Sequence, residues 1–309
     1  MNKNSKIYIA GHEGMVGTIL HQELLSRNYS NIVTARFEDL DLRNQMEAFT
    51  FIENEKPEYI FLIAGKVGGI QANIDHPGEF LYDNLTISAN VIESARKNNV
   101  RKLLVLGSSC IYPRLCPQPM QESHLLSGPL EPTNEGYAIG KIAGLKLSQY
   151  YRKQYGCNFI AAIPPNLYGP GDNFITDDSH VISALIKKIH EASENKISEV
   201  KVWGTGSARR EFMYNRDLVD SLIFLMNHYN DDEHINVGSG TDISIKELAN
   251  MIKGIVGFNG ELIWDESKPD GMPKKLMDSS RIFDMKWSPK VDLFEGLSKT
   301  YEWYLQNKE

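Results

Sequence analysis

The chain has 309 residues, of which 41% are hydrophobic and 24% charged, so a low-complexity, collagen-like or disordered chain is excluded. Its 33 basic and 40 acidic residues give a formal net charge of −7. Proteins that hold nucleic acid by its phosphates usually carry a basic excess, so we expect no nucleic-acid partner.

The cysteines and the hydropathy pattern indicate a cytoplasmic protein. Cys110, Cys116 and Cys157 form neither a disulfide framework nor a metal-binding spacing, which favours a reducing compartment. The histidines show no H-x-H or H-E-x-x-H spacing, so no metal is predicted. The apolar stretch before Gly11 is too short for a signal peptide, and no run approaches the ~18–20 apolar residues of a membrane span. We therefore expect no membrane partner.

Short apolar runs alternate with amphipathic stretches in the first half of the chain. The runs are typical of strands that are covered on both faces. Strands are expected at residues 7–10, 32–35, 59–64, 103–106 and 159–163, and helices at 15–27, 80–98 and 134–155. This alternation predicts an α/β fold with a doubly wound parallel sheet of the Rossmann type.

The second half is less regular and richer in turn signals. Helices are expected near residues 178–193, 216–228, 244–256 and 293–306, and short strands near 200–203 and 262–264. We expect residues 1–165 to form the Rossmann-type domain and residues 166–309 to form mainly a smaller lobe. A segment at about 212–240 is expected to return to the first domain.

A glycine-rich turn follows the first expected strand and opens the first expected helix. In Gly11-His12-Glu13-Gly14-Met15-Val16-Gly17, the G-x-x-G-x-x-G spacing lets the backbone turn tightly and approach a pyrophosphate. The helix N-terminus then supplies N–H donors and a positive dipole end. The motif in this context predicts a dinucleotide site.

The end of the second expected strand bears on the choice of dinucleotide. Arg36 suits the 2′-phosphate of NADP, whereas an acidic residue at this point would bind the ribose hydroxyl of NAD. Glu38 and Asp39 follow directly, and Arg36 could also be an ordinary solvated charge. On balance the sequence favours NADP.

Three side chains indicate chemistry beside that cofactor. Tyr137 and Lys141 form a Y-x-x-x-K pair on one helix face, where the ammonium is expected to lower the pKa of the phenol. Ser108 follows the fourth expected strand, at the sheet edge where ligands bind in open α/β sheets. It could hydrogen-bond the same substrate oxygen as Tyr137.

Together these motifs resemble the extended short-chain dehydrogenase/reductase superfamily. Longer stretches resemble the GDP-L-fucose synthase family, and the resemblance covers essentially the whole chain. The matching stretches are residues 10–17, 64–70, 106–113, 131–138, 166–170, 203–206, 210–212 and 267–271.

The resemblance implies NADPH-dependent epimerisation of GDP-4-keto-6-deoxy-mannose at C3 and C5, followed by reduction of its C4 ketone. Ser108 and Tyr137 would stabilise the enolate oxygen, and Tyr137 would protonate it after reduction. Cys110 and His180 match the family's base and acid at the ring carbons. The expected catalytic set is Ser108, Cys110, Tyr137, Lys141 and His180.

The resemblance also implies binding residues. Those expected at NADP are Gly11, Gly14, Met15, Val16, Gly17, Arg36, Asp41, Leu42, Ala64, Leu106, Lys141, Pro164, Asn166, Leu167 and His180. Those expected at the GDP-sugar are Ser109, Asn166, Lys188, Trp203, Arg210, Asp270 and Lys275. Members of the superfamily often form homodimers through helices that match residues 80–98 and 134–155.

Taken alone, several of these residues have plainer interpretations. Cys110 could be a small buried hydrophobe, His180 a helix-start residue, Trp203 a core residue, and Lys188 and Lys275 surface charges.

The chain also departs from the family pattern close to the expected site. The departures are Phe37, Gly65, Gly136, Gly140 and Pro165. They leave open a reductase that acts only at C4 of another GDP-4-keto sugar, such as a GDP-4-keto-6-deoxy-heptose in surface-polysaccharide biosynthesis.

Two further alternatives are disfavoured by the residues themselves. A sugar-nucleotide dehydratase would carry an acidic residue where Ser109 and Cys110 stand. A non-catalytic NADP-binding protein is expected to lack Ser108, Tyr137 or Lys141, and this chain retains all three.

Overall fold

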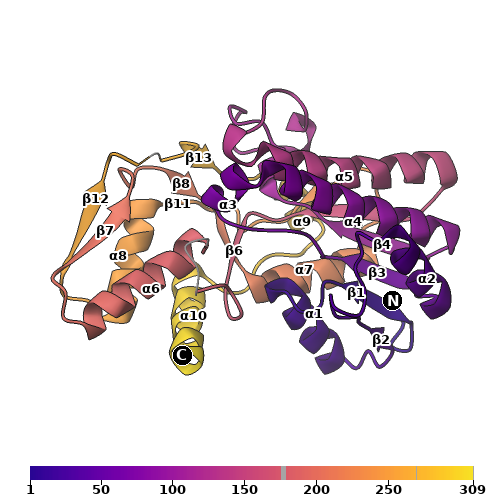
Figure 1. Cartoon of the computed structure of the whole chain (residues 1–309), viewed down its shortest axis with the longest axis horizontal. Helices are drawn as coiled ribbons and strands as arrows, with labels where there is room; N and C mark the ends of the chain where they lie inside the picture. The colour runs from indigo at the N-terminus through magenta and orange to yellow at the C-terminus, as the bar shows by residue number, and fades with distance from the viewer. Residues whose placement is uncertain (175–178, 269, 309) are drawn as a thin grey trace.

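The computed structural model describes residues 1–174, 179–268 and 270–308, and a six-stranded parallel sheet forms its centre (Figure 1). The strand order is β10-β5-β4-β3-β1-β2. The strands are β1 (Ile7–Ala10), β2 (Ile32–Val33), β3 (Tyr59–Leu62), β4 (Lys102–Leu106), β5 (Phe159–Ile163) and β10 (Ile235–Asn236). The predicted doubly wound parallel sheet is confirmed. The strand order reverses direction between β1 and β3, so a crevice is expected at their carboxyl ends.

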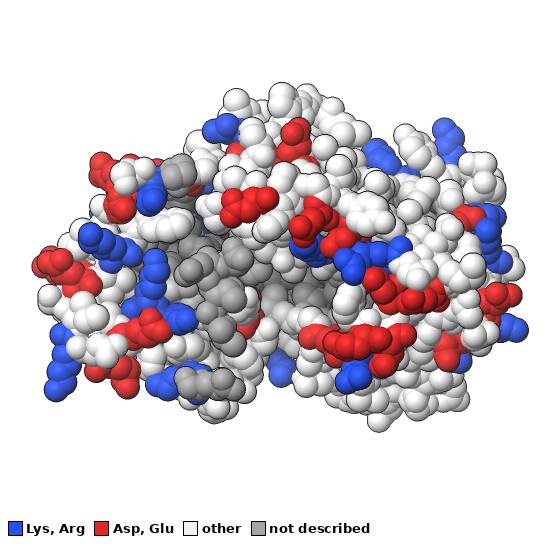
Figure 2. Space-filling view, in the orientation of Figure 1, with Lys and Arg blue, Asp and Glu red and all other residues white. Residues whose placement is uncertain are grey.

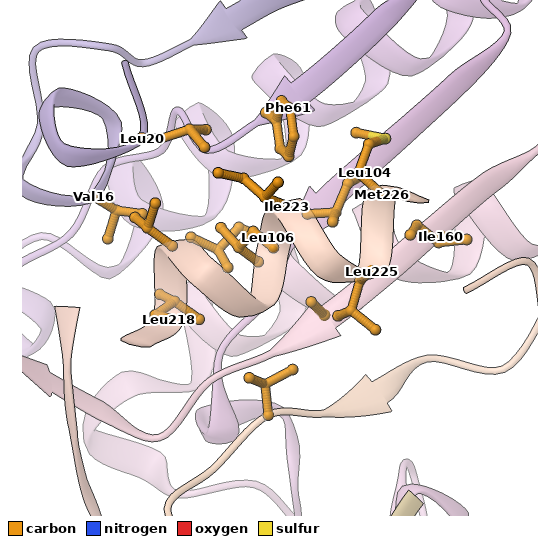
Figure 3. Packing of buried hydrophobic residues seen from close by; sticks show 14 of the residues in the cluster. Val16, Leu20, Phe61, Leu104, Leu106, Ile160, Leu218, Ile223, Leu225 and Met226 are labelled. Carbon is orange, nitrogen blue, oxygen red and sulfur yellow. The ribbon is translucent and has the colours of Figure 1, made fainter. Parts of the chain in front are cut away.

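Helices cover both faces of this sheet, which explains why its strands are continuous apolar runs. One face carries α1 (Met15–Ser26) and α7 (Asn215–His228), and the other carries α2 (Gln45–Glu55), α4 (Pro77–Lys97) and α5 (Glu135–Tyr155). Figure 3 shows Ile223 of α7 packed among Phe61 and Leu104 of the sheet and Leu20 of α1. Residues 215–236 thus return to the sheet from the second half of the chain.

Gly136 and Gly140 let the first turns of α5 lie close against α4. A Cβ atom added to Gly136 would lie 2.4 Å from the carbonyl oxygen of Pro77. A Cβ added to Gly140 would lie 2.9 Å from the Cβ of Asn84. Both glycines are departures from the family pattern, and the structure explains them by this close approach. They fix the distance between α4 and the helix that carries Tyr137 and Lys141.

The second half of the chain builds a lobe with a hydrophobic core of its own. Its helices are α6 (Val181–Glu194), α8 (Ile245–Val256) and α10 (Leu293–Asn307). Its strands form three small sheets: β7 (Glu199–Trp203) with β12 (Glu261–Asp265), β6 (Asn166–Tyr168) with β9 (Phe212–Tyr214), and β8 (Arg209–Arg210) between β11 (Ile243–Ser244) and β13 (Lys274–Lys275).

The elements differ from the expected ones mainly at their ends and in short segments. The strand expected at 59–64 ends at Leu62, because the backbone N–H groups of Ile63 and Ala64 both donate to the Ala10 carbonyl. The helix expected at 178–193 begins at Val181, and residue 178 lies outside the described residues. The sequence pattern does not predict α2, the short helices α3 (Ile70–Asp75) and α9 (Ser280–Asp284), or most strands of two or three residues. In the described part of the chain, no helix has the length and apolar character needed to cross a membrane.

Candidate active site

The glycine-rich turn after β1 fits a dinucleotide pyrophosphate. Gly11 has φ +95°, and a Cβ there would lie 2.6 Å from the backbone nitrogen of Ala64. A Cβ on Gly17 would lie 2.0 Å from the carbonyl oxygen of Gly11, so the turn closes only around glycine. A Cβ on Gly14 would meet only that same oxygen, at 3.7 Å, and no side chain caps α1. The N–H groups at the start of α1, over Met15, Val16 and Gly17, are therefore open to an anion.

The loop after β2 presents two guanidinium groups. The Arg36 side chain is 60% exposed, and its Nε donates to Asp39 at 3.2 Å. Arg43, which the sequence analysis missed, forms an ion pair with Asp41 at 2.8 Å and lies over the Phe37 ring at 5.3 Å. Phe37, one of the residues at which the chain departs from the expected family pattern, therefore has a second cation, Arg43, beside it in the same loop. Arg36 is held only by acidic neighbours near the sheet edge and remains accessible to a phosphate.

The other residues expected at the cofactor lie at strand ends or just beyond them. Leu42 is buried, and its carbonyl accepts from the Asn90 side chain at 2.9 Å. Ala64 lies two residues after the end of β3, Leu106 is the last residue of β4, and Pro164 directly follows β5. Asn166 and Leu167 are the first two residues of β6. Ala64, Leu106 and Pro164 thus lie at the carboxyl edge of the sheet, where such a ligand is expected.

Ser108, Cys110 and Tyr137 are brought together at the carboxyl end of β4. Ser108 caps the short helix η1 (Ser109–Ile111), and its Oγ accepts from the Cys110 backbone nitrogen at 3.3 Å. Tyr137 lies in the first turn of α5, and its phenol is close enough to Ser108 for that side chain to lower the pKa of the phenol. Ser109 is buried, with its backbone nitrogen bonded to the Pro164 carbonyl at 3.0 Å.

The predicted effect of Lys141 on Tyr137 is wrong for this structure. Burial raises the pKa of the Tyr137 phenol well above its ordinary value, with the charge of Cys110 adding to the rise and the Ser108 hydrogen bond opposing it. The Lys141 ammonium is 5.8 Å from the phenol ring centroid and donates to the Leu106 carbonyl at 3.3 Å. Burial lowers the pKa of Lys141 to about 8. Tyr137 is therefore protonated at neutral pH, which suits a proton donor better than a base.

Asn84 of α4 belongs to the site and was missed in the sequence analysis. Its side chain is buried, and its Nδ2 donates to the Lys66 carbonyl at 2.9 Å. Its Oδ1 has no hydrogen-bond partner among the described residues. A Cβ added to Gly65 would lie 2.6 Å from this Oδ1 and 2.9 Å from the Lys141 Nζ. Gly65 thus leaves open the space between the amide and the ammonium.

Cys110 is a polar, partnered thiol and not the inert buried residue that the sequence alone allowed. Its Sγ accepts from Asn134 Nδ2 at 3.2 Å and from Lys275 Nζ at 3.3 Å. Burial tends to raise the pKa of the thiol, but the Lys275 charge and hydrogen bonds from Ser108, Lys275 and Asn134 lower it overall. Such a thiol is ionised more readily than an ordinary cysteine.

His180 stands immediately before α6 and is held by a buried carboxylate. Its Nδ1 lies 3.3 Å from Asp172 Oδ1, and the opposite oxygen of Asp172 accepts from the Ser183 hydroxyl. The loop that carries Asp172 lies beside the glycine-rich turn, since a Cβ on Gly171 would lie 3.9 Å from the Met15 Cα. In the described residues no hydrogen bond joins His180 to Cys110. The sequence analysis did not identify Asp172.

Replacing Asp172 with Asn is expected to lower the pKa of His180. The hydrogen bond with Asp172 is the largest cause of the raised pKa of this imidazole, while burial opposes it. The pH titration of the His180 ring signal by NMR measures the change directly. His190, whose pKa burial lowers, is the internal control and its titration should stay in place. An unchanged His180 titration in Asp172→Asn would contradict the assignment.

A second group of expected site residues lies on the C-terminal lobe. Trp203 is 62% exposed, which excludes the core alternative, and the amines of Lys188 and Lys268 lie 5.6 and 5.3 Å from its ring centroid. Asp270 accepts from the Thr205 backbone nitrogen at 2.8 Å. Pro269, within the matching stretch 267–271, lies outside the described residues. Figure 2 shows that basic and acidic side chains are interspersed on this face of the lobe.

Arg210 connects the two groups. Its Nη2 donates to the Asp270 carbonyl at 3.2 Å, and its Nη1 donates to the Met272 carbonyl at 2.5 Å. Burial lowers the pKa of this guanidinium, while the charges of Asp270, Glu131 and Cys110 raise it. Arg210 is thus a partly desolvated cation between the thiol and the exposed Trp203 region.

A cavity of about 670 Å³ lies next to these strands but does not contain the reactive side chains. It is lined by Arg209 and Arg210 of β8, by β9, and by residues 289–293, with neither Ser108 nor Tyr137 in its wall. Among the described residues, no group of three or more His, Cys, Asp or Glu side chains could hold a metal ion. We therefore locate the candidate site by the side chains that meet at the carboxyl end of β4, and not by this cavity.

Comparisons with known proteins agree with this arrangement. Residues 7–238 match the NAD dependent epimerase/dehydratase family. The chain is 54% identical over 307 residues to "Probable GDP-L-fucose synthase 1" of Oryza sativa subsp. japonica, covering 99% of this chain and 94% of the relative.

Two solved structures from Campylobacter jejuni superpose on nearly the whole chain. One is a GDP-6-OMe-4-keto-L-xylo-heptose reductase, with a TM-score of 0.94, 38% identity, and coverage of 100% of this chain and 99% of that one. The other is MlghC, a GDP-mannoheptose C4 reductase with NADP bound, with a TM-score of 0.91, 39% identity, and coverage of 99% of both chains. The chain therefore belongs to the NAD dependent epimerase/dehydratase family of extended short-chain dehydrogenases/reductases, within its group of GDP-L-fucose synthase relatives.

Proposed function

We propose that this chain is an NADPH-dependent epimerase/reductase of a GDP-4-keto-6-deoxy sugar, of the GDP-L-fucose synthase type. The observation that carries the proposal is the meeting of Ser108, Cys110 and Tyr137 at the carboxyl end of β4. The 54% identity to a probable GDP-L-fucose synthase over nearly the whole chain supports it.

Epimerisation needs a base and an acid at carbons next to a ketone. The C4 carbonyl acidifies the protons at C3 and C5, because the enolate that forms places its charge on the C4 oxygen. Cys110, with its lowered thiol pKa, takes such a proton, and His180 delivers one to the ring carbon. Ser108 and the protonated Tyr137 stabilise the enolate oxygen by hydrogen bonding.

Reduction of the ketone uses the same oxygen and the same phenol. NADPH supplies a hydride to C4 when it is bound. Tyr137, whose raised pKa keeps it protonated, donates a proton to the resulting alkoxide. Lys141 lies one helical turn away, with its ammonium 5.8 Å from the ring centroid of Tyr137, and forms part of the wall beside this phenol.

The proposed cofactor site lies in residues 1–165, and residues 166–309 form mainly the sugar-nucleotide lobe. The glycine-rich turn cradles the pyrophosphate, and Arg36 pairs with the 2′-phosphate that distinguishes NADP from NAD. Lys188, Trp203, Arg210 and Asp270 bind the GDP moiety, where cations and an exposed aromatic ring suit a nucleoside diphosphate.

We further propose that the protein works as a cytoplasmic homodimer. Exposed apolar side chains lie along α4 and α5, namely Tyr82, Leu85, Ile139 and Tyr150. Two copies can bury these faces against each other as a bundle of helices. Free cysteines at 110, 116 and 157 fit a reducing cytoplasm.

One incubation in D₂O tests the reaction. Purified protein is given GDP-4-keto-6-deoxy-mannose and NADPH, and the product is analysed by mass spectrometry and NMR. We expect deuterium at both C3 and C5 of GDP-fucose, and loss of that deuterium in Cys110→Ser. Unused NADPH and undeuterated sugar would contradict the proposal.

The second candidate is a reductase that acts only at C4 of another GDP-4-keto sugar, such as a GDP-4-keto-6-deoxy-heptose. The superposition on two heptose C4 reductases favours it. In the same incubation this enzyme consumes NADPH without placing deuterium on the ring. A 4-keto-heptose substrate would then be turned over faster than the 6-deoxy-mannose derivative.

A further inference from the structure

Lys275 was expected at the diphosphate of the substrate, but its amine is directed to a sulfur atom. Its Nζ lies 3.3 Å from Cys110 Sγ, within hydrogen-bonding distance for sulfur. The neighbouring Lys274 extends in the other direction and forms an ion pair with Asp242 at 2.9 Å. The two lysines thus form a matched pair: one amine contacts the thiol and the other a carboxylate.

The backbone holds Lys275 firmly in this position. Strand β13 pairs in parallel with β8, and the Lys275 carbonyl accepts from the Glu211 backbone nitrogen at 3.1 Å. One residue further on, the Leu276 nitrogen donates to the Gln118 side chain at 2.9 Å. Strand and loop bonds therefore fix the main chain on both sides of Lys275, and the side chain extends from this fixed point to the sulfur.

Charged and titratable groups face Cys110 from three elements. Lys275 approaches from β13, Arg210 from β8 and Tyr137 from α5. Asn134, a neutral amide, donates to the sulfur at 3.2 Å. Tyr137 is neutral at ordinary pH, and of the two cations only Lys275 is hydrogen-bonded to the sulfur. A cation in that contact favours the thiolate over the thiol.

We propose that Lys275 is a positioning residue that holds Cys110 as a thiolate, ready to accept a proton from carbon. This role rests on the proposed function, in which Cys110 is the base. In that step the C–H bond breaks and an S–H bond forms. The carbon's electron pair moves into the ring C–C bond, and the negative charge comes to rest on the C4 oxygen. The thiol beside the Lys275 ammonium then releases its proton to solvent water, which restores the thiolate.

The test follows the rate at which iodoacetamide alkylates each cysteine as a function of pH, resolved by peptide mass spectrometry. Only the thiolate reacts, so the midpoint of the profile reports ionisation and is insensitive to access. In Lys275→Met we expect the Cys110 profile to move to higher pH and the rate at neutral pH to fall about tenfold. Cys157, whose pKa burial raises, is the internal control and should react as in the wild type.

Two further variants separate charge from packing. Lys274→Met removes the neighbouring charge and should leave the Cys110 profile unchanged. Lys275→Arg keeps the cation and should retain the low-pH profile; it also serves if Lys275→Met does not fold. A Cys110 profile in folded Lys275→Met that overlays the wild type would overturn the inference. An equal loss in Lys275→Arg would assign the effect to packing and would overturn it as well.

Alkylation requires no sugar nucleotide, so its outcome is separate from that of the D₂O incubation. A wild-type protein with a low-pH Cys110 profile but no ring deuterium contradicts the proposed epimerisation alone. Ring deuterium together with a Cys110 profile that is indifferent to Lys275 contradicts this inference alone.

Discussion

Replacing Tyr137 with Phe is expected to lower the rate of NADPH consumption with the 4-keto substrate by about 10³-fold, in line with the loss of a general acid. The variant removes one hydroxyl from a buried ring beside Ser108 and leaves the ring's packing in place. NADPH binding should stay near that of the wild type, because the glycine-rich turn and Arg36 are untouched. The measurement is the loss of NADPH absorbance with time.

The control for this prediction lies on the same helix. Tyr150 is 61% exposed on α5, and Tyr150→Phe removes the same hydroxyl outside the site. It should leave turnover unchanged.

From neutral to mildly basic pH, wild-type reduction should not be lost through ionisation of the phenol, because the raised pKa of Tyr137 keeps it protonated there. Near-normal turnover in Tyr137→Phe would remove the phenol from the proposed mechanism.

Replacing Gly17 with Ala is expected to weaken NADPH binding by about ten- to a hundredfold and to lower the melting temperature by several degrees. The new Cβ would lie 2.0 Å from the Gly11 carbonyl oxygen and 2.7 Å from the His12 Cα, so the backbone of the turn must move. Such overpacking costs about 1–3 kcal/mol, and each 1.4 kcal/mol is about tenfold in affinity. Calorimetric titration with NADPH and thermal unfolding measure the two effects.

Gly14→Ala distinguishes ligand approach from backbone strain. Its Cβ would meet only the Gly11 carbonyl oxygen, at 3.7 Å, so the fold should be kept and the melting temperature with it. NADPH should nevertheless bind about tenfold more weakly, because the methyl group occupies the space through which a pyrophosphate reaches the helix N-terminus. Gly254→Ala in α8, where a Cβ meets nothing within 4 Å, is the control for both variants. Unchanged affinity in Gly14→Ala would move the pyrophosphate away from this turn.

The central sheet could be predicted from the sequence because its strands are buried on both faces. Every residue of runs such as Ile7–Ala10 and Phe159–Ile163 is buried, and a short continuous apolar run of this kind indicates an inner strand. Helix α2 lacks this signal, since only Ala48 and Ile52 of its residues are buried. The strands β8, β11 and β13 are two residues long, too short for any hydropathy period to show.

The candidate site likewise has one part that local sequence patterns predict and another that depends on the folded chain. Ser108, Tyr137 and Lys141 were found because local spacing and a strand end suffice to place them. The contact of Lys275 with Cys110 joins residues 165 positions apart, and no local pattern encodes it. The raised pKa of Tyr137 was missed for a related reason: it depends on burial and on the direction in which Lys141 points, which only the folded chain determines.

Both edges of the six-stranded sheet are formed by very short strands. β2 has two residues, Ile32 and Val33, and β10 has two, Ile235 and Asn236. An edge this short exposes few unpaired backbone groups and offers a poor template for a strand from another molecule. The parallel sheet is thereby protected from edge-to-edge aggregation, although its inner strands are strongly apolar. A second copy of the chain that binds here must therefore attach through helical surfaces and not by extending the sheet.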